Sequence, residues 1–507
     1  MNKWLISLTV MLPTLVEIID TSVVNVALDH IRGSLSAGID EATWVITSYL
    51  VSNAIIIPMT AWLSRFFGRK NYLLFSVALF TLSSFMCGSA WSLRSLIFFR
   101  VVQGMAGGAL QPLSQAILLE TFPPKQHGMA MAIFGVGIMF GPVAGPLMGG
   151  WITDHWSWHW IFFINIPIGV ISIIMILFFV VNPPYMERHK MKVDYWGLAL
   201  LTVGLGCLQI VLDKGQREDW FSSRLIIFLS IASLSCLILF VFNEYFAETP
   251  IVDLRIFRNA TFSSGNLIMF FAFANLLSTL VLLPIYLQTL MGYTAYLAGL
   301  VLGPGGIATM LAMPIAGKLV TKINQKLILA FGIIVAAYAA YLMSNFNLLA
   351  DFNSIAWPRV VLGVGMGFLF IPLNTLVMSG ISKEGMGNAT AIFNLLRNLG
   401  GSCGVAFVTT MLARRAQFYQ VDLVSHLSPE NRNLQSFTPY ISDLLRERGF
   451  AYLFHDQGSL GTIYNELLRQ ATMLAFNDVF RMLAMMMVSI LSLVFVMRKL
   501  DKKPGLA

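Results

Sequence analysis

The sequence predicts an all-α membrane protein with fourteen transmembrane helices, on the basis of its composition, its apolar windows and the placement of its basic residues. Of the 507 residues, 57% are hydrophobic and only 11% are charged. A soluble domain has about a quarter of its residues charged. Most of the outer surface must therefore face lipid, and the composition excludes an ordinary soluble protein.

The positive net charge of +8 does not indicate a nucleic-acid-binding protein. In such proteins the basic residues gather on one face or in one stripe. Here they lie at the ends of the apolar segments, where Lys and Arg set the orientation of membrane helices. The sequence has no HExxH motif, Walker loop or paired zinc ligands, so we expect no metal, no cofactor and no enzymatic activity.

The apolar windows give the count of helices. A spanning helix needs about 20 mainly apolar residues, and most of the windows that meet this length are joined by short polar connections. The predicted spans are residues 5–28, 42–64, 71–92, 96–119, 128–150, 161–182, 195–212, 225–243, 262–287, 296–317, 327–344, 358–381, 388–412 and 476–497.

Lys and Arg residues divide the connections into two alternating sets, which predicts the orientation. An even number of spans places both termini on one side, and the connections of that side hold most of the basic residues. Cytoplasmic loops are enriched in Lys and Arg, so we expect both termini in the cytoplasm of a bacterial cell, with the protein in its inner membrane. The short connections of the other set hold only Arg32, Arg94, Lys214, Arg217 and Arg224.

One connection is long, because residues 413–475 separate the last two spans. It contains Pro429 and two amphipathic stretches, around Ile441–Arg448 and Ile463–Gln470. The same charge rule places this segment on the periplasmic side. We expect a helical hairpin or a lid outside the membrane.

An internal repeat with a constant shift of 259 residues relates the fourth and fifth spans to the twelfth and thirteenth. The stretch Arg100–Gly108 matches Arg359–Gly367, and Ala132-Ile-Phe134 matches Ala391-Ile-Phe393. Internal repeats are typical of transporters. The repeat predicts two related six-helix halves, residues 1–182 and 261–507, with two inserted helices and their flanking loops in 183–260.

Two acidic residues interrupt the first span and are the strongest candidates for proton coupling. A charge inside a span costs roughly 2.5–3.5 kcal/mol on insertion scales and usually marks a pathway or relay. Glu17 and Asp20 share a helix face with Thr21, and Asn25 falls at the edge of that face. Two such carboxylates in a low dielectric do not both ionise easily, so we expect one of them to hold a proton. The alternative is that both only brace the cavity wall.

The fourth span carries a polar stripe. We expect its Gln103, Gln111 and Gln115, together with Asn25 of the first span, to line the substrate cavity. Arg100, Gln103, Gln111 and Gln115 lie within about 120° of one another around the helix, and the motif Gly104-x-x-x-Gly108 permits close approach of a neighbour. Arg100 is the natural counter-charge for an acid of the first span. The alternative is an arginine held by backbone carbonyls.

Polar residues of the second half are weaker candidates. We expect Asn374, Asn394 and Arg397 to line a cavity between the halves near the middle of the membrane. Arg359 lies near the end of its span, where a side chain that reaches out to water would explain its charge.

Glycine and proline are dense in the fifth span, at Gly137, Gly141, Pro142, Gly145 and Pro146. Residues of this kind kink a helix and remove side-chain bulk from one side. This suits a helix about which two halves rock. A close-packed interface with no part in coupling is the alternative.

These motifs together resemble the fourteen-helix drug:proton antiporters of the major facilitator superfamily, the EmrB/QacA group, and within it EmrB-like multidrug efflux subunits. The resemblance covers essentially the whole chain. It implies the major facilitator fold, proton transfer through the Arg100 motif, and antiport rather than symport. It rests on Asp20–Leu28, Arg100–Gly108, Gly137–Gly145, Trp158–Gly169, and Tyr286–Gln288 with Gly292-Tyr293.

The chain departs from the pattern of that group in three places. The loop between the second and third spans normally carries an acid where this sequence has Arg65, so the resemblance does not extend to the salt bridge ascribed to that acid. Pro146 replaces a glycine of the antiporter motif, and Asp29 stands where proline often follows the first-span signature.

From these observations we expect a multidrug exporter that moves amphipathic or hydrophobic compounds outward in exchange for protons. The alternatives are a proton symporter that imports a small nutrient, and a membrane scaffold or sensor that transports nothing. The expected partners are small-molecule drugs, protons and the lipid bilayer. The resemblance adds a periplasmic adaptor and an outer-membrane channel, because EmrB-like relatives work with both.

Overall fold

The computed structural model describes residues 2–182, 194–247, 250–428, 431–447 and 455–497. Throughout these ranges the regular structure is helical, without a strand. In chain order the elements are α1 (Lys3–Ser34), α2 (Ile39–Ala42), α3 (Trp44–Phe67), α4 (Arg69–Gly88), α5 (Leu93–Gly107), α6 (Leu110–Thr121), η1 (Pro124–Gln126), α7 (His127–His155), α8 (Trp160–Phe163), α9 (Asn165–Phe179), α10 (Tyr195–Lys214), η2 (Trp220–Ser222), α11 (Arg224–Phe246), η3 (Leu254–Arg258), α12 (Ala260–Ile285), η4 (Tyr286–Leu290), α13 (Ala295–Leu319), α14 (Gln325–Met343), α15 (Phe352–Met378), α16 (Met386–Ser425), α17 (Arg432–Glu447) and α18 (His455–Val496).

The predicted count of fourteen crossings is confirmed. Thirteen helical segments of the described chain are long and apolar enough to cross a membrane. The fourth predicted span is divided into α5 and α6, each too short to qualify alone. The division falls at Gly108 and Ala109, because Pro112 has no N–H to donate to the carbonyl of Gly108. Together α5 and α6 supply the remaining crossing.

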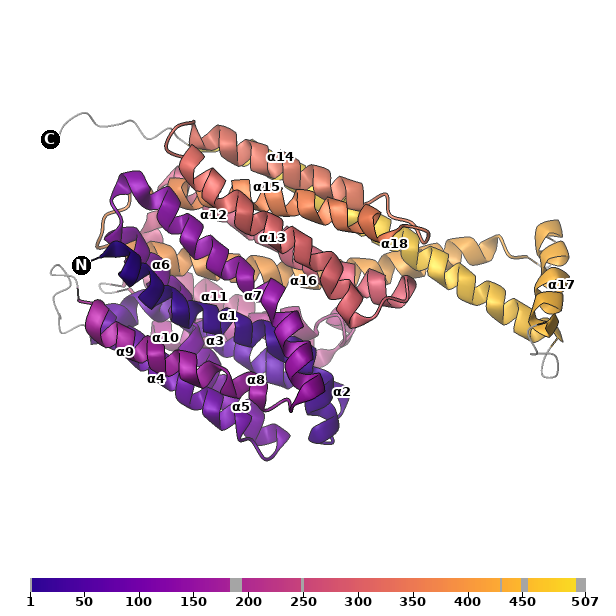
Figure 1. Ribbon diagram of the computed structural model, residues 1–507, viewed down its shortest axis with the longest axis horizontal. Helices are drawn as coiled ribbons and strands as arrows, with labels where there is room; N and C mark the ends of the chain where they lie inside the picture. The colour runs from indigo at the N-terminus through magenta and orange to yellow at the C-terminus, as the bar shows by residue number, and fades with distance from the viewer. Residues whose placement is uncertain (1, 183–193, 248–249, 429–430, 448–454, 498–507) are drawn as a thin grey trace.

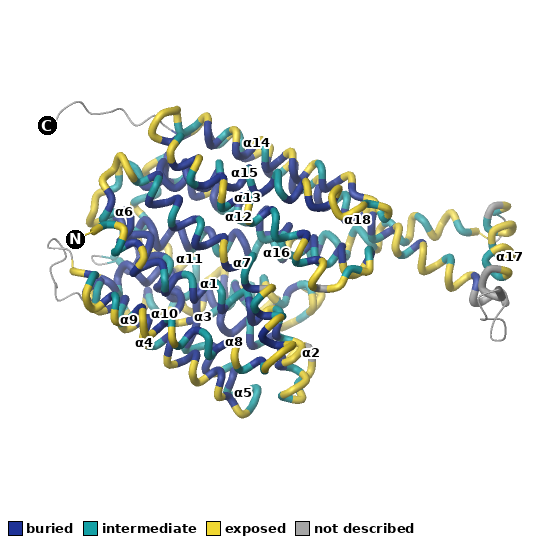
Figure 2. The backbone as a smooth tube through the Cα atoms, in the orientation of Figure 1, coloured by how far each residue is buried: buried dark blue, intermediate teal, exposed yellow. Residues whose placement is uncertain are grey.

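The helices differ in how far they are buried, which separates central from peripheral ones. In the most apolar window of α15, 78% of the residues are buried, whereas in α11 the share is only 17%. Large side chains such as Phe228 and Phe242 project outward from α11. Figure 2 shows this pattern along the bundle, with buried segments inside and exposed ones at the rim.

Figure 1 shows one elongated bundle, with α14 and α15 along one side and α4, α5 and α9 along the opposite side. The helices before residue 183 meet those after 260 mainly where α7 packs on α13 and where α3 and α6 pack on α16. The inserted pair, α10 and α11, packs on this seam, because α10 contacts both α3 and α16. We call the two helix sets the first and second half, and their boundaries stay a prediction.

The two ends of the bundle are distinct. At one end α1 begins and α18 ends, and we call it the terminal end (Figure 1). From the other, the hairpin end, α16 and α18 project and α17 lies across their tips. The predicted helical hairpin is therefore present.

The helices on either side of the predicted connection are longer than the predicted spans, whose own bounds stay a prediction. Residue 413 begins no loop, since α16 continues to Ser425 and α18 already begins at His455. The sequence becomes polar beyond Leu412, but the Ala, Arg and Gln residues there are good helix formers. Contacts between the two helices, such as Gln420 Nε2 donating to Tyr464 Oη at 2.7 Å, support the extension.

Candidate functional site

Asp20 is fully buried and is held by three helices of the first half. Arg100 Nη1 donates to Asp20 Oδ2 at 2.6 Å. Gln103 Nε2 and Asn165 Nδ2 both donate to Oδ1, at 3.0 and 2.7 Å. Ser84 Oγ accepts from the same two amides. The carboxylate thus has a charged partner and two neutral donors, the environment that a buried charge needs.

The guanidinium of Arg100 is enclosed as completely as its partner. Its Nε donates to the carbonyl of Val45 at 3.1 Å, and its carbon lies 4.1 Å from the ring centre of Tyr49. Gly104, one turn further along α5, makes room for this arrangement, because a side chain there would collide with the backbone carbonyl of Tyr49. The predicted pairing of Arg100 with an acid of the first span is present, and the backbone carbonyl is an additional partner.

Glu17 occupies a different environment from Asp20, although it lies one turn away on α1. Tyr49 Oη and Asn53 Nδ2 donate to Glu17 Oε1 at 3.1 and 3.3 Å. Gln111 Nε2 donates to Oε2 at 2.5 Å. Gly107 leaves the space for this cluster, since an added Cβ would lie 2.6 Å from Tyr49 Oη.

The predicted polar stripe of the fourth span divides at the break between α5 and α6. Arg100 and Gln103, before the break, face Asp20. Gln111 and Gln115, after the break, reach helices of the second half: Arg397 Nη2 donates to Gln111 Oε1, and Gln115 Nε2 donates to Asn374 Oδ1 at 2.7 Å. One stripe therefore serves both an internal cluster and the contact between the halves.

Gln115 and Asn374 are 259 residues apart, so they occupy equivalent positions of the repeat and bond directly to one another. Asn394 Nδ2 donates to Gln115 Oε1 at 2.6 Å and completes this buried group. The three predicted cavity residues thus form a polar contact between the halves.

The equivalent of Arg100 in the second half is Arg359, and the interpretation of Arg359 as a side chain that reaches out to water is wrong. Its exposed fraction is only 5%. Arg359 Nη1 donates to Thr279 Oγ1 at 3.4 Å, and Nε finds no hydrogen-bond partner among the described residues. Thr279 is itself 259 residues after Asp20, so the repeat keeps the arginine and its position but replaces the acid.

The glycine-rich motif of α7 packs along α1. Side chains added at Gly137, Gly141 and Gly145 would collide with Met11, Ile18 and Ser22 in turn. This row of glycines brings α7 against the same helix that carries both carboxylates. Pro142 is partly buried, and the side chain of Pro146 lies outside the described part of the structure.

Four site residues were not predicted, and one predicted residue lies apart. Tyr49, Asn53, Ser84 and Asn165 are neutral, so no charge within a span indicated them, although Asn165 belongs to one of the motifs that carry the family resemblance. Asn25 is exposed and joins neither carboxylate network.

The loop that departs from the family pattern keeps one buried ion pair. Arg69 pairs with Glu120, and both side chains are largely buried. Arg65, which stands in the usual place of an acid, lines a cavity of about 390 Å³ together with Asp253, a residue that precedes η3. An acid is therefore present at this place, supplied by another segment.

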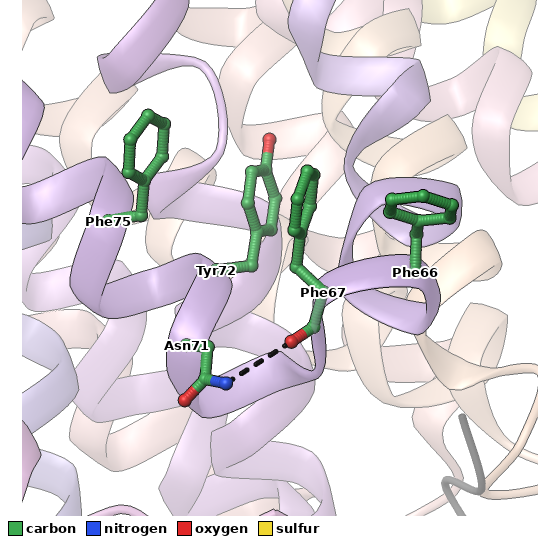
Figure 3. Close-up of a pocket in the computed structure, with 5 residues that line it drawn as sticks. All are labelled: Phe66, Phe67, Asn71, Tyr72 and Phe75. Atoms are coloured by element: carbon green, nitrogen blue, oxygen red, sulfur yellow. Dashed lines mark hydrogen bonds between the residues drawn. The ribbon is translucent and has the colours of Figure 1, made fainter.

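A second cavity, of about 370 Å³, lies beside the turn between α3 and α4 (Figure 3). It is lined by Phe66, Phe67, Asn71, Tyr72 and Phe75, and Asn71 Nδ2 donates to the carbonyl of Phe67 at 3.4 Å. The rings of Phe67 and Phe75 are at least half exposed. None of the predicted site residues contributes to it.

Among the residues that the structure describes, no group of three or more His, Cys, Asp or Glu side chains is placed to hold a metal ion.

Comparison with known proteins agrees with the fold and with the motifs. The sequence model of the family described as Major Facilitator Superfamily matches residues 10–405 of this chain. The Multidrug export protein EmrB of Haemophilus influenzae is 40% identical over 434 residues, 85% of each chain. The Multidrug export protein EmrB of Escherichia coli (strain K12) is 35% identical over 492 residues, 97% of this chain and 94% of that protein.

Among solved structures, the human organic anion transporter MFSD10 has a TM-score of 0.60 to this chain. The alignment covers 96% of this chain and 100% of that one, and the identity is 12%. At this identity the likeness shows the fold alone. With the family model and the EmrB relatives, it establishes that this chain is a member of the major facilitator superfamily and of the family of the EmrB export proteins.

Proposed function

We propose that this chain exports amphipathic or hydrophobic toxic compounds across the bacterial inner membrane in exchange for protons. Relatives that carry the name multidrug export protein cover most of the chain. The observation that carries the coupling part of the proposal is the buried pair of Asp20 and Arg100. A buried carboxylate opposite a fixed positive charge can release a proton at one stage of a cycle and take one up at another.

In the proposed cycle, the substrate site between the halves opens alternately to the inner and the outer side of the membrane. Substrate from the inner side binds between the halves and favours the ionised form of Asp20, which Arg100, Gln103 and Asn165 stabilise by hydrogen bonds. After the substrate has left on the outer side, a proton from that side neutralises Asp20 and allows the return. The driving force is the proton gradient.

The test is transport into proteoliposomes in which the pH gradient and the voltage are set separately. Asp20→Asn is expected to abolish accumulation against a gradient, because the amide cannot carry the proton. Asp29→Asn is the matched control, since Asp29 lies on the same helix with 88% of its side chain exposed. Normal accumulation by the Asp20 variant would show that the coupling residue lies elsewhere.

The Asp20 variant leaves Arg100 without its charged partner, so its fold must be checked. Thermal unfolding and substrate binding serve this purpose. A variant that unfolds at a similar temperature and still binds substrate, yet does not accumulate it, supports the proposal.

A proton symporter that imports a nutrient is the second candidate within the superfamily. The two differ in the direction of proton movement when substrate is added on one side. Antiport moves protons opposite to the substrate, and symport moves them together. A scaffold or sensor without transport activity would give neither signal.

We place the terminal end in the cytoplasm and the hairpin end in the periplasm. The support is the excess of Lys and Arg in the connections of the terminal end. Tyr440 is an exposed residue of α17. The variant Tyr440→Cys should react with a membrane-impermeant maleimide that is added on the periplasmic side. Reaction only after the membrane is opened would reverse the orientation.

The projecting helices α16, α17 and α18 are the proposed docking point for a periplasmic adaptor that leads to an outer-membrane channel. Removal of α17 should then abolish co-purification of the adaptor and leave transport into proteoliposomes intact. If the adaptor still co-purifies, the hairpin does not dock it. Loss of proteoliposome transport would instead make the hairpin a lid.

A further inference from the structure

Glu17 is the carboxylate of the site that is linked to the second half, through Gln111. Its exposed fraction is 3%, and three side chains donate hydrogen bonds to its carboxylate: Tyr49 and Asn53 from α3 and Gln111 from α6. An ionised carboxylate accepts hydrogen bonds and donates none. The arrangement therefore fits the ionised form.

Gln111 links Glu17 to the second half by hydrogen bonds. Its Nε2 donates to Glu17, and its Oε1 accepts from Arg397 on α16. A side-chain amide has donors at one end and an acceptor at the other. This orientation is the one that satisfies a carboxylate on one side and a guanidinium on the other.

Arg397 depends on this link for its charge compensation. It is 3% exposed, and none of the ion pairs of the described residues includes it. Its guanidinium carbon lies 5.3 Å from the ring centre of Phe273, and its Nε has no hydrogen-bond partner. A buried cation needs an anion nearby, and the anion nearest along its hydrogen bonds is Glu17.

Few other charges face Glu17. Asp20 lies one turn along α1 and is neutralised by Arg100. From α3 come the hydroxyl of Tyr49 and the amide of Asn53, and α6 contributes only the amide of Gln111. On the opposite side α7 presents glycines to this part of α1. The charge of Glu17 is thus balanced chiefly by Arg397 of the second half.

We propose that Glu17 is a second proton-responsive carboxylate, and that its charge decides whether Gln111 and Arg397 hold the two halves together at this level. A proton on Oε2 of Glu17 faces the NH2 group of Gln111, so the amide of Gln111 must turn until its oxygen accepts from Glu17. The NH2 group of Gln111 then faces the N–H groups of Arg397. Two donors cannot bond, so the link between the halves is lost.

The two carboxylates thus have separate tasks. The side chains that donate to Asp20, namely Arg100, Gln103 and Asn165, belong to the first half, so protonation of Asp20 does not break a contact between the halves directly. Tyr49 joins the two positions, because its ring lies against Arg100 and its hydroxyl donates to Glu17. Gln111 and Arg397 are positioning residues in this scheme. The inference deepens the proposed antiport and rests on it for its role in a cycle.

The test measures the distance between the halves by pulsed spin-label spectroscopy in lipid nanodiscs, across a range of pH and without substrate. One label pair replaces Lys125 and Lys322 at the terminal end, and another replaces Arg94 and Leu349 at the hairpin end, all exposed positions. For the unmodified site we expect the packed population, with the short terminal-end distance, to fall as the pH is lowered.

Glu17→Gln should remove this pH dependence and leave the packed population low at every pH, with its ratio to the open population reduced at least about tenfold at high pH. Arg397→Gln should have the same effect, and the double variant should add little, because both remove one link. Glu17→Asp, which can still ionise, should restore part of the pH dependence. Arg359→Gln is the control, a buried arginine of the same half without a bond to Gln111.

An unchanged pH dependence in Glu17→Gln would overturn the inference, as would effects of Glu17→Gln and Arg397→Gln that simply add. Neither result bears on the proposed export, which is tested by accumulation of substrate in the Asp20 variant. Conversely, the unmodified protein could show the pH-dependent change in distance and yet accumulate no substrate. That result would support the link between Glu17 and Arg397 and contradict the proposed export.

Discussion

Arg100 and Arg359 occupy equivalent places in the two halves, yet among the residues that the structure describes only Arg100 has an acidic partner. In the first half Arg100 pairs with Asp20 and lies against Tyr49. In the second half Arg359 meets Thr279 at 3.4 Å. The same backbone arrangement therefore carries a complete ion pair in one copy and an isolated cation in the other.

The glycines that follow Arg100 and Arg359 pack in the same way in the two halves, although the two arginines have different partners. Added side chains at Gly104 and Gly108 would collide with α3, at Tyr49 and Asn53. Their counterparts Gly363 and Gly367 would collide with α13, at Gly305 and Ala312. We infer that the glycine pattern serves the fold in both halves, whereas the charge pair serves function in the first half alone.

The largest expected effect separates the two arginines. Arg100→Gln should abolish uphill export and lower the free energy of unfolding by about 3–5 kcal/mol, because it leaves Asp20 buried without a counter-charge. Arg359→Gln removes a charge that has no acidic partner among the described residues. It should therefore change neither uphill export nor the free energy of unfolding by much. The measurements are thermal unfolding in detergent and accumulation in proteoliposomes. Equal losses in the two variants would refute the functional asymmetry.

The glycine pattern predicts equal effects in the two halves. Gly104→Ala and Gly363→Ala should each destabilise by about 1–3 kcal/mol, because both introduce a methyl group where a backbone carbonyl already lies. Gly303→Ala is the control, since within the described structure no atom of a neighbouring helix lies within 4 Å of its added Cβ. Thermal unfolding of the three variants decides. A loss confined to one half would show that the packing is not equivalent.

The smallest effect comes from supplying the missing acid. Thr279→Asp should place a carboxylate beside Arg359 and raise the unfolding temperature slightly. In the Arg359→Gln background the same change should destabilise, because the carboxylate is then buried alone. The double-mutant cycle should give a coupling of about 0.5–3 kcal/mol between the two positions. A coupling near zero would mean that Thr279 does not face Arg359 as Asp20 faces Arg100.

Much of this comparison could be predicted from the sequence, because it rests on hydrophobic length and on a constant shift. The apolar windows predicted fourteen crossings, and the repeat paired Arg100 with Arg359. The pairing of Asp20 with Arg100 followed from the rule that a charge within a span needs a partner.

What the sequence did not reveal depends on contacts between distant segments. Spacing along α6 placed Gln111 on the stripe of Arg100, but the break before Leu110 redirects Gln111 toward Arg397, 286 positions away. The polar residues after Leu412 marked the end of the predicted span, but they did not reveal that α16 continues without a break to Ser425. Arg359 was misread because its distance from the helix end said nothing about the neighbours that bury it.

The most direct test of the asymmetry is accumulation driven by a pH gradient alone, at zero voltage, in matched proteoliposomes of the unmodified protein, Asp20→Asn and Arg359→Gln. We expect the unmodified protein and the Arg359 variant to accumulate substrate to a similar level, and the Asp20 variant to stop at equilibrium. Accumulation by the Asp20 variant, or its loss in the Arg359 variant, would contradict the account.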